Sequence, residues 1–240
     1  MVVKETIKPC LREMFLEYLK FDSVFRKLFV EIEEKFDIII FGGVVRDYIT
    51  SKTFEPRDID LVLYSNSPGM NDLETILYSY YPDNSIKKNQ FEGYKLQSAY
   101  VLFDIWLLEN TWAFKQGLIK ASLDNLLQSV CLNIDAYAYH LTDMYFIRNC
   151  DEKGLPEKID FLLKKNPFFN LNIIRALYLS KRYNIEISTQ LRDAALNFFS
   201  SDKQANQEAM FLQKKHYNKI VLSKNDIANM LFDNERSHLK

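Results

Sequence analysis

The sequence predicts an α+β fold, in which a small mixed β-sheet with flanking helices is followed by a short all-helical C-terminal region. The first observation is the stretch 36–63, FDIIIFGGVVRDYITSKTFEPRDIDLVL, whose pattern indicates strand, glycine turn, short helix, loop and second strand. The second is an apolar stripe at spacings of three and four over 11–35, typical of an amphipathic helix. The third is the segment 189–240, whose periodicity indicates two or three helices.

Each element follows from a local pattern. Ile38–Phe41 is a β-branched and aromatic run, typical of a buried strand, and the two glycines after it end that strand. The helix over 11–35 is expected to break near Phe21-Asp22-Ser23. Further patterns predict helical turns over 44–50, a strand over 58–63, a helix over 72–80, a polar loop over 81–89, paired strands over 93–97 and 100–107, a helix over 120–128, a linker and helix over 151–167, and helices around 191–199, 203–215 and 225–232.

The bulk composition is that of an ordinary globular protein of 240 residues with a net charge of −1. Its length fits a larger domain over 1–150 and a smaller helical one over 151–240. The chain has no apolar run of membrane-spanning length and no signal-peptide core over 1–10, so we expect no membrane partner. Cys10, Cys131 and Cys150 form no C-x-x-C pair, which favours a cytoplasmic location.

Two carboxylates lie at the start of the second strand, in the run Asp58-Ile59-Asp60. Side chains alternate along a strand, so Asp58 and Asp60 share one face while Ile59 points to the other. Neighbouring carboxylates repel each other unless a cation lies between them. Their hard oxygen atoms suit magnesium, and the sequence therefore indicates a divalent-metal site.

A third carboxylate, Asp104, lies inside the apolar strand YVLFDIWLL. An unpaired carboxylate there would cost several kcal/mol, so Asp104 needs a partner. That partner is either a metal shared with the first two acids or a set of backbone amides. Trp106 shares this strand face and Trp112 follows soon after; packing is the favoured role for both, with stacking on a base as the alternative.

The order GGVVRD, then a spacer, then RDIDLVL resembles the catalytic head of polymerase-β-type nucleotidyltransferases, in the branch of bacterial CCA-adding enzymes and poly(A) polymerases. The resemblance implies that Asp58, Asp60 and Asp104 hold two Mg²⁺ ions and are catalytic. It also implies a nucleoside triphosphate (NTP) bound at Gly42, Gly43, Arg46 and Asp47. Glycines allow close backbone approach, and helix-opening amides can hold phosphate oxygens. The alternative for Arg46 and Asp47 is a local salt bridge.

The resemblance weakens after residue 120. Ser129, Val130 and Cys131 stand where the family has Arg-Arg-Asp, and of the next positions only Ala136 matches. The segment NPFFNLNIIRALYLSKRYNIEIS resembles the start of the family's helical neck, where Arg175 and Ala176 match. Arg175 lies on an apolar helix face and therefore requires an anion, either a carboxylate or the phosphate of a bound nucleotide.

The function that these features imply is transfer of a nucleotidyl group from an NTP to an acceptor, with release of pyrophosphate. The resemblance favours an RNA 3′ end as acceptor, and a protein or small molecule is the alternative. A second hypothesis is a nucleotide-binding module that has lost catalysis, because the segment 129–135 departs from the family pattern. A small basic cluster is formed by Lys214, Lys215, His216 and Lys219. It has few charges for binding RNA phosphates, so we favour its interpretation as a solvent-exposed helix face.

Overall fold

The computed structural model describes residues 10–51, 56–65, 69–81, 86–98, 100–148, 154–201 and 204–232. The chain divides into two compact units. The first comprises Met1–Ser129 and Asp135–Leu155, and the second comprises Val130–Ile134 and Pro156–Lys240. Within the described residues no helix has both the length and the apolar character needed to cross a membrane.

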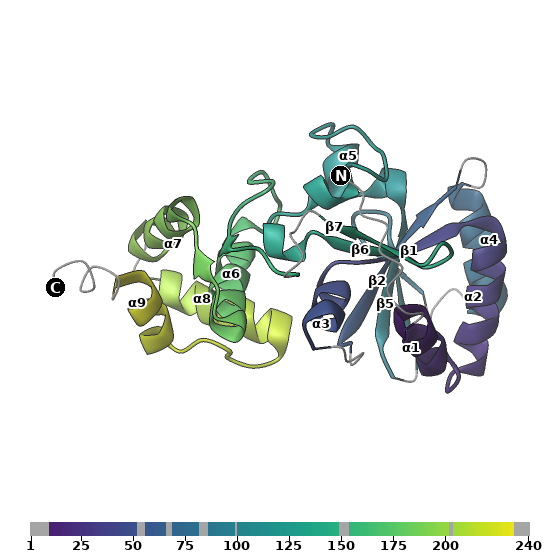
Figure 1. The fold of residues 1–240 in the computed structure, drawn as a ribbon, viewed down its shortest axis with the longest axis horizontal. Helices are drawn as coiled ribbons and strands as arrows, with labels where there is room; N and C mark the ends of the chain where they lie inside the picture. Colours follow the sequence, from purple (N-terminus) through teal and green to yellow (C-terminus); the bar gives the residue numbers. More distant parts are fainter. Residues whose placement is uncertain are drawn as a thin grey trace. The chain divides into compact units, whose positions relative to one another are not determined.

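The first unit is built on one mixed sheet, which confirms the predicted fold class (Figure 1). Its described strands follow the order β3-β4-β5-β2-β1-β6-β7, and the pair β2 and β5 is parallel while the other pairs are antiparallel. The strands are β1 (Asp37–Phe41), β2 (Asp58–Tyr64), β3 (Lys87–Lys88), β4 (Tyr94–Gln97), β5 (Leu102–Leu107), β6 (Tyr137–His140) and β7 (Tyr145–Arg148).

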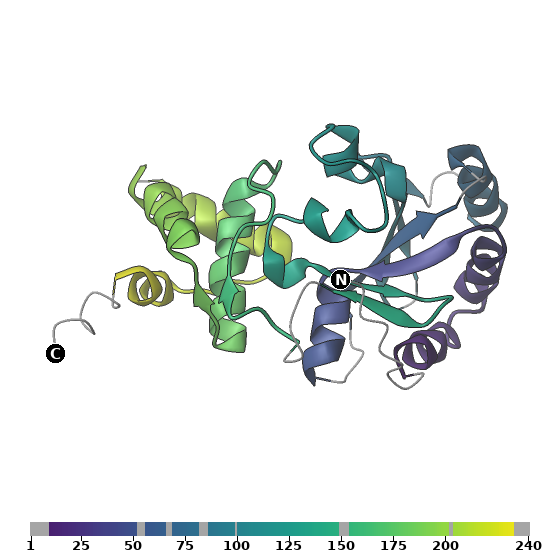
Figure 2. The same ribbon diagram turned by 45° about the horizontal axis from the view of Figure 1, so that its top comes forward.

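Three helices cover one face of this sheet, namely α1 (Cys10–Leu19), α2 (Ser23–Lys35) and α4 (Met70–Tyr80). Figures 1 and 2 show them on the same side of the strands. The predicted break between α1 and α2 is confirmed, because Asp22 caps α2 by accepting a hydrogen bond from the Phe25 amide at 2.9 Å.

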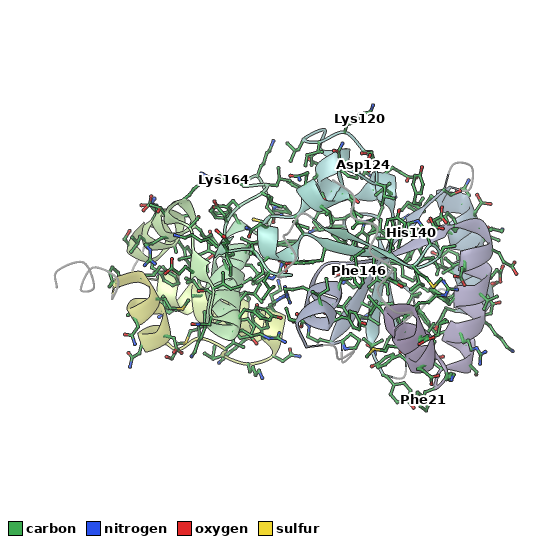
Figure 3. All side chains as sticks on the ribbon, in the orientation of Figure 1. Phe21, Lys120, Asp124, His140, Phe146 and Lys164 are labelled. Carbon is green, nitrogen blue, oxygen red and sulfur yellow. The ribbon has the colours of Figure 1, made fainter. Side chains whose placement is uncertain are left out.

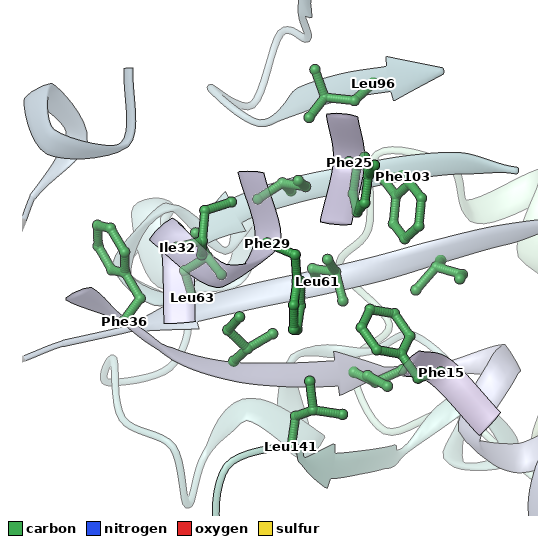
Figure 4. Packing of buried hydrophobic residues seen from close by; sticks show 14 of the residues in the cluster. Phe15, Phe25, Phe29, Ile32, Phe36, Leu61, Leu63, Leu96, Phe103 and Leu141 are labelled. Carbon is green, nitrogen blue, oxygen red and sulfur yellow. The ribbon is translucent and has the colours of Figure 1, made fainter. Parts of the chain in front are cut away.

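Aromatic rings fill the space between these helices and the sheet (Figure 4). Phe25 of α2 stacks on Phe103 of β5 with ring centroids 3.8 Å apart, and Phe15 of α1 meets the same ring edge-on at 6.4 Å. Each fully buried side chain of this size contributes about 1.5–3 kcal/mol of transfer free energy. Alternate residues of β2 and β5 point into this packing. The residues between them therefore point to the opposite face of the sheet.

The second face of the sheet carries the acids. Between Trp106 and residue 129 the chain forms η2 (Leu108–Asn110), α5 (Trp112–Lys115) and η3 (Leu126–Ser129), of which η2 contacts β2 and α5 contacts both η2 and η3. The predicted helix over 120–128 is wrong except for the short 3-10 helix η3. Polar side chains replace the helical hydrogen bonds there, since Asn125 donates to the Lys120 carbonyl at 3.0 Å. Lys120 projects outward from this segment (Figure 3).

The second unit is mainly helical, as predicted. It contains α6 (Phe169–Tyr183), α7 (Thr189–Ser201), α8 (Ala205–Tyr217) and α9 (Lys224–Phe232), with the short parallel strands β8 (Lys158–Ile159) and β9 (Glu186–Ile187). Lys158 thus lies in a strand, and the expected helix over 151–167 is absent from the described residues 154–167. Residues 151–153 lie outside the described part. Asn133 explains the difference, because its side chain bonds the Lys158 carbonyl and the Asp160 amide at 2.8 and 2.9 Å.

Candidate functional site

The sheet register brings the acids of β2 and β5 together. Asp60 lies directly opposite Asp104 on the neighbouring parallel strand, and Asp58 lies opposite Leu102, two residues earlier on the same face. Adjacent strands are about 4.8 Å apart, so the Asp60 and Asp104 side chains leave the sheet side by side. Asp58 and Asp104 are partly accessible, with 42% and 19% of their side chains exposed. This placement agrees with the predicted clustering of carboxylates on one face.

The glycine turn lies against these acids. Phe41 at the end of β1 pairs with Asp60, and Gly42 follows with a φ of 74°, in the left-handed region that favours glycine. A Cβ atom on Gly42 would lie 3.8 Å from Oδ2 of Asp60. The Gly42 amide donates to the Tyr137 carbonyl of β6 at 2.7 Å. The turn therefore fixes the start of α3 (Gly43–Ser51), with its helix-opening amides, beside the carboxylates.

Arg46 of α3 is buried between carboxylates and is only 5% exposed. Its Nη1 lies 2.6 Å from Oδ1 of Asp135, and its Nε and Nη2 lie 2.8 and 2.7 Å from Oδ1 of Asp47. The local salt bridge with Asp47, weighed above as the alternative, is therefore present. The pairing with Asp135 was not predicted, because the two residues are 89 positions apart. A role of Arg46 and Asp47 in nucleotide binding stays a prediction.

Asp104 has side-chain partners that were not predicted. The Lys95 ammonium of β4 donates to its Oδ2, and the Asn89 amide donates to its Oδ1 at 3.2 Å. Asn89 is itself held by its turn, because its Oδ1 accepts from the Phe91 and Gly93 amides at 2.8 and 3.0 Å. Both partners belong to the β3–β4 hairpin. The sequence did contain a signal for the Lys95 contact, because Lys95 lies on the predicted strand that pairs with the strand of Asp104.

The hairpin is anchored to the elements around it. Lys115 of α5 lies 2.5 Å from Glu92, and this hydrogen bond holds the pKa of the Glu92 carboxyl below its usual range. On the other face, Glu74 of α4 accepts hydrogen bonds from Tyr94 and Lys88, and these lower the pKa of Glu74. Burial, with the neighbouring Glu74, raises the pKa of Tyr94 to about 12. Hydrogen bonds to Glu74 and Tyr94 raise the pKa of Lys88.

The acid cluster fits magnesium by its chemistry, since its donors are hard carboxylate oxygens on one sheet face. Asp104 is paired with the cationic side chain of Lys95, and Asp58 with that of Arg57 at 2.7 Å. Across the part of the chain that the structure describes, no group of three or more His, Cys, Asp or Glu residues is arranged to enclose a metal ion. A cation that binds Asp58 or Asp104 would compete with these basic side chains for the carboxylate oxygens.

The remaining predicted residues lie outside the acid cluster. The Trp106 indole donates to Thr111 at 3.1 Å and meets Phe41 edge-on at 6.3 Å, as its favoured packing role predicts. Arg175 lies on α6 of the second unit and donates to Asn172 at 3.2 Å; its proposed contact with nucleotide stays a prediction. Lys214, Lys215 and His216 lie in the last turn of α8, where cations interact favourably with the helix dipole.

The fold of this chain is similar to the folds of solved CCA-adding enzymes and of a tRNA nucleotidyltransferase. The chain is similar to a CCA-adding enzyme solved with CTP, with a TM-score of 0.60, 16% identity and coverage of 93% of this chain and 54% of that one. A CCA-adding enzyme solved with ATP matches with a TM-score of 0.55, 16% identity and coverage of 100% and 62%. The Thermotoga maritima CCA-adding enzyme, complexed with tRNA, matches with a TM-score of 0.53, 18% identity and coverage of 80% and 48%.

The predicted resemblance is thereby confirmed at the level of the fold. No protein-family model matches the sequence, and no curated protein matches it. The chain spans about half to three fifths of the length of these solved enzymes, from 48% to 62%.

Proposed function

We propose that this chain is a metal-dependent nucleotidyltransferase, which moves a nucleotidyl group from an NTP to an acceptor and releases pyrophosphate. The observation that carries the proposal is the register of β2 and β5, in which Asp60 and Asp104 are direct neighbours beside the Gly42 turn. Three acids on one sheet face, two of them adjacent, are costly to retain without cations. The fold shared with CCA-adding enzymes supports the same function.

In this proposal the chain's own residues bind the metal ions and the NTP and orient them for the reaction. Asp58, Asp60 and Asp104 hold two Mg²⁺ ions, which when bound neutralise triphosphate charge and lower the pKa of the acceptor hydroxyl. The backbone of Gly42 and Gly43 approaches the phosphates, and the first amides of α3 donate to their oxygens. Arg46 and Asp47 shape the nucleotide site. Arg175 remains a predicted nucleotide-binding residue, as the resemblance implies. Such positioning and charge neutralisation supply most of the catalysis in phosphoryl transfer.

The acceptor that we propose is an RNA 3′ end. Its support is the fold, which the chain shares with a CCA-adding enzyme solved in complex with tRNA. Residues 151–240 contain 15 Lys and Arg against 11 Asp and Glu, whereas residues 1–150 contain 16 against 21. A basic segment of this kind is compatible with contacts to phosphates. A protein or small-molecule acceptor is the alternative.

A second candidate is a nucleotide-binding module without catalysis. The observation that favours it is the pairing of the acids with basic side chains, Lys95 on Asp104 and Arg57 on Asp58. Such pairs satisfy the carboxylates without a metal ion. A protein of this type binds NTP but does not release pyrophosphate.

One assay separates these functions. Pyrophosphate release is measured with each of the four NTPs and Mg²⁺, with and without total cellular RNA, and Asp60→Asn serves as the blank. Release that needs both RNA and Asp60 is the expected result, and the preferred NTP identifies the base added. Saturable NTP binding without release under any condition would support the non-catalytic module and contradict the enzyme.

A further inference from the structure

The β3–β4 hairpin contacts both oxygens of the Asp104 carboxylate. Lys95 pairs with Asp104 across the antiparallel strands β4 and β5, so the contact follows from the strand register. Residues directly opposite in such a pair have Cβ atoms about 5 Å apart, within easy reach of a lysine side chain. The second oxygen accepts from Asn89, whose amide the turn residues hold in place.

The contact between Lys95 and Asp104 is accessible from solvent. The Lys95 side chain is 41% exposed and that of Asp104 is 19% exposed. A partly exposed ion pair contributes little to stability, about 1 kcal/mol or less. The fold therefore does not depend on this pair, and the carboxylate can exchange the ammonium for another cation.

We propose that Lys95 is a positioning residue that holds Asp104 in place and competes with a divalent cation for its carboxylate. This inference rests on the proposed function, because it assigns the competition to the same acids. A carboxylate oxygen that accepts from an ammonium has less capacity to ligate a metal, and a nearby positive charge repels a dication. Lys95 thus weakens cation binding at Asp104 until an NTP adds negative charge to the site.

The test measures Mn²⁺ binding to the full chain without nucleotide, by electron paramagnetic resonance of the free ion. We expect Lys95→Met to tighten Mn²⁺ binding about tenfold, because it removes one partly screened charge next to the acids. Lys95→Arg keeps the charge and should bind Mn²⁺ as the wild type does. Lys27→Met is the matched control, since Lys27 is an exposed residue of α2, on the helix-covered face of the sheet. It should leave the affinity unchanged.

The double variant Lys95→Met/Asp104→Asn separates a local effect from a general one. If the gain in affinity acts through Asp104, the double variant should lose it. Thermal unfolding with and without Mn²⁺ supplies a second readout, in which the cation should raise the midpoint of Lys95→Met more than that of the wild type.

Two results would overturn the inference, and only the second would also contradict part of the proposed function. Mn²⁺ binding that is equal or weaker in Lys95→Met than in the wild type would reject competition by Lys95 and leave the nucleotidyltransferase proposal standing. If neither protein binds Mn²⁺, with or without ATP, the two-metal part of the proposed function falls as well.

Discussion

Arg46 is a buried cation whose charge is compensated within its own unit. Asp135, with 8% of its side chain exposed, lies 2.6 Å from Nη1, and the more accessible Asp47 contacts the other side of the guanidinium. A buried arginine that loses a carboxylate keeps a desolvated charge with less to balance it. At the residue scale, this pair ties the helix after the glycine turn to the segment that precedes β6.

Asp135→Asn should therefore destabilise the protein strongly. We expect the free energy of unfolding to fall by about 3 kcal/mol, because the buried guanidinium loses its most buried anion. Asp47→Asn is the comparison, and it should cost about 1 kcal/mol, since Asp47 is one-third exposed and water replaces part of its contact. Urea denaturation measures both values. Equal losses in the two variants would contradict a dominant role for Asp135.

At the scale of elements, the β3–β4 hairpin depends on a glycine. A Cβ atom on Gly93 would lie 2.8 Å from the Asn89 amide nitrogen and 3.3 Å from Oδ1 of Asp104. Gly93→Ala should therefore move Asn89 off Asp104 and lower the free energy of unfolding by about 1–3 kcal/mol, the usual range for overpacking. Gly69→Ser is the control, because nothing lies within 4 Å of that position and serine is a favoured residue before a helix. If Gly93→Ala unfolds at the same urea concentration as the wild type, the turn accommodates a Cβ atom at this position and the prediction is wrong.

The same hairpin is joined to α4 through Glu74. Hydrogen bonds from Tyr94 and Lys88 hold the pKa of Glu74 below its ordinary value of 4.5. A carboxyl group with a lowered pKa stabilises the folded state above its unfolded pKa, and this contribution is lost as the pH falls through the folded pKa. Glu74→Gln should therefore be less stable than the wild type at pH 7, and the difference should shrink as the pH drops below about 4.5.

Unfolding midpoints in urea between neutral and acidic pH measure this difference. Glu13→Gln, a change at an exposed carboxylate of α1, is the control and should follow the wild type. A difference between Glu74→Gln and the wild type that stays constant with pH would contradict the ionic role of Glu74.

The elements around the acids were predictable, and their partners were not. The strand, glycine turn, helix and strand over 36–63 have local signals, so β1, α3 and β2 were expected close to their observed bounds. Asp104 was identified because a carboxylate in an apolar strand requires a partner. Lys95 reaches Asp104 across β4 and β5, whose pairing was predicted without its register, whereas Asn89 lies in the stretch that was expected to be a polar loop.

Local helical spacing also failed to predict the structure of two segments. The segment 120–128 has helical spacing, yet side chains such as Asn125 bond to the backbone and leave only η3. Lys158 was expected in a helix and instead lies in β8, which pairs with β9 and is held by Asn133. The Asn125 contact lies within its own stretch, whereas β9 and Asn133, the partners of the Lys158 segment, lie outside the stretch 151–167.

At the scale of the whole molecule, the chain combines a mixed-sheet unit that carries the acids with a helical unit of its own. The second unit has separate internal contacts, for example Gln213, fully buried, whose Oε1 accepts from the Val221 and Leu222 amides at 2.9 and 2.7 Å. The acids, the glycine turn and the hairpin all belong to the first unit. The assignment of a catalytic head to 1–150 and a neck-like domain to 151–240 stays a prediction.

The most direct test of the proposed function asks whether the acids of β2 and β5 act as one site. Pyrophosphate release is measured at saturating NTP and Mg²⁺ for Asp60→Asn, Asp104→Asn and the double variant, with Asp37→Asn, at the start of β1, as the control. Residues that act as a unit are strongly non-additive, so either single change should abolish turnover and the second should add nothing, while Asp37→Asn stays active. Turnover that survives both changes would contradict catalysis at these carboxylates.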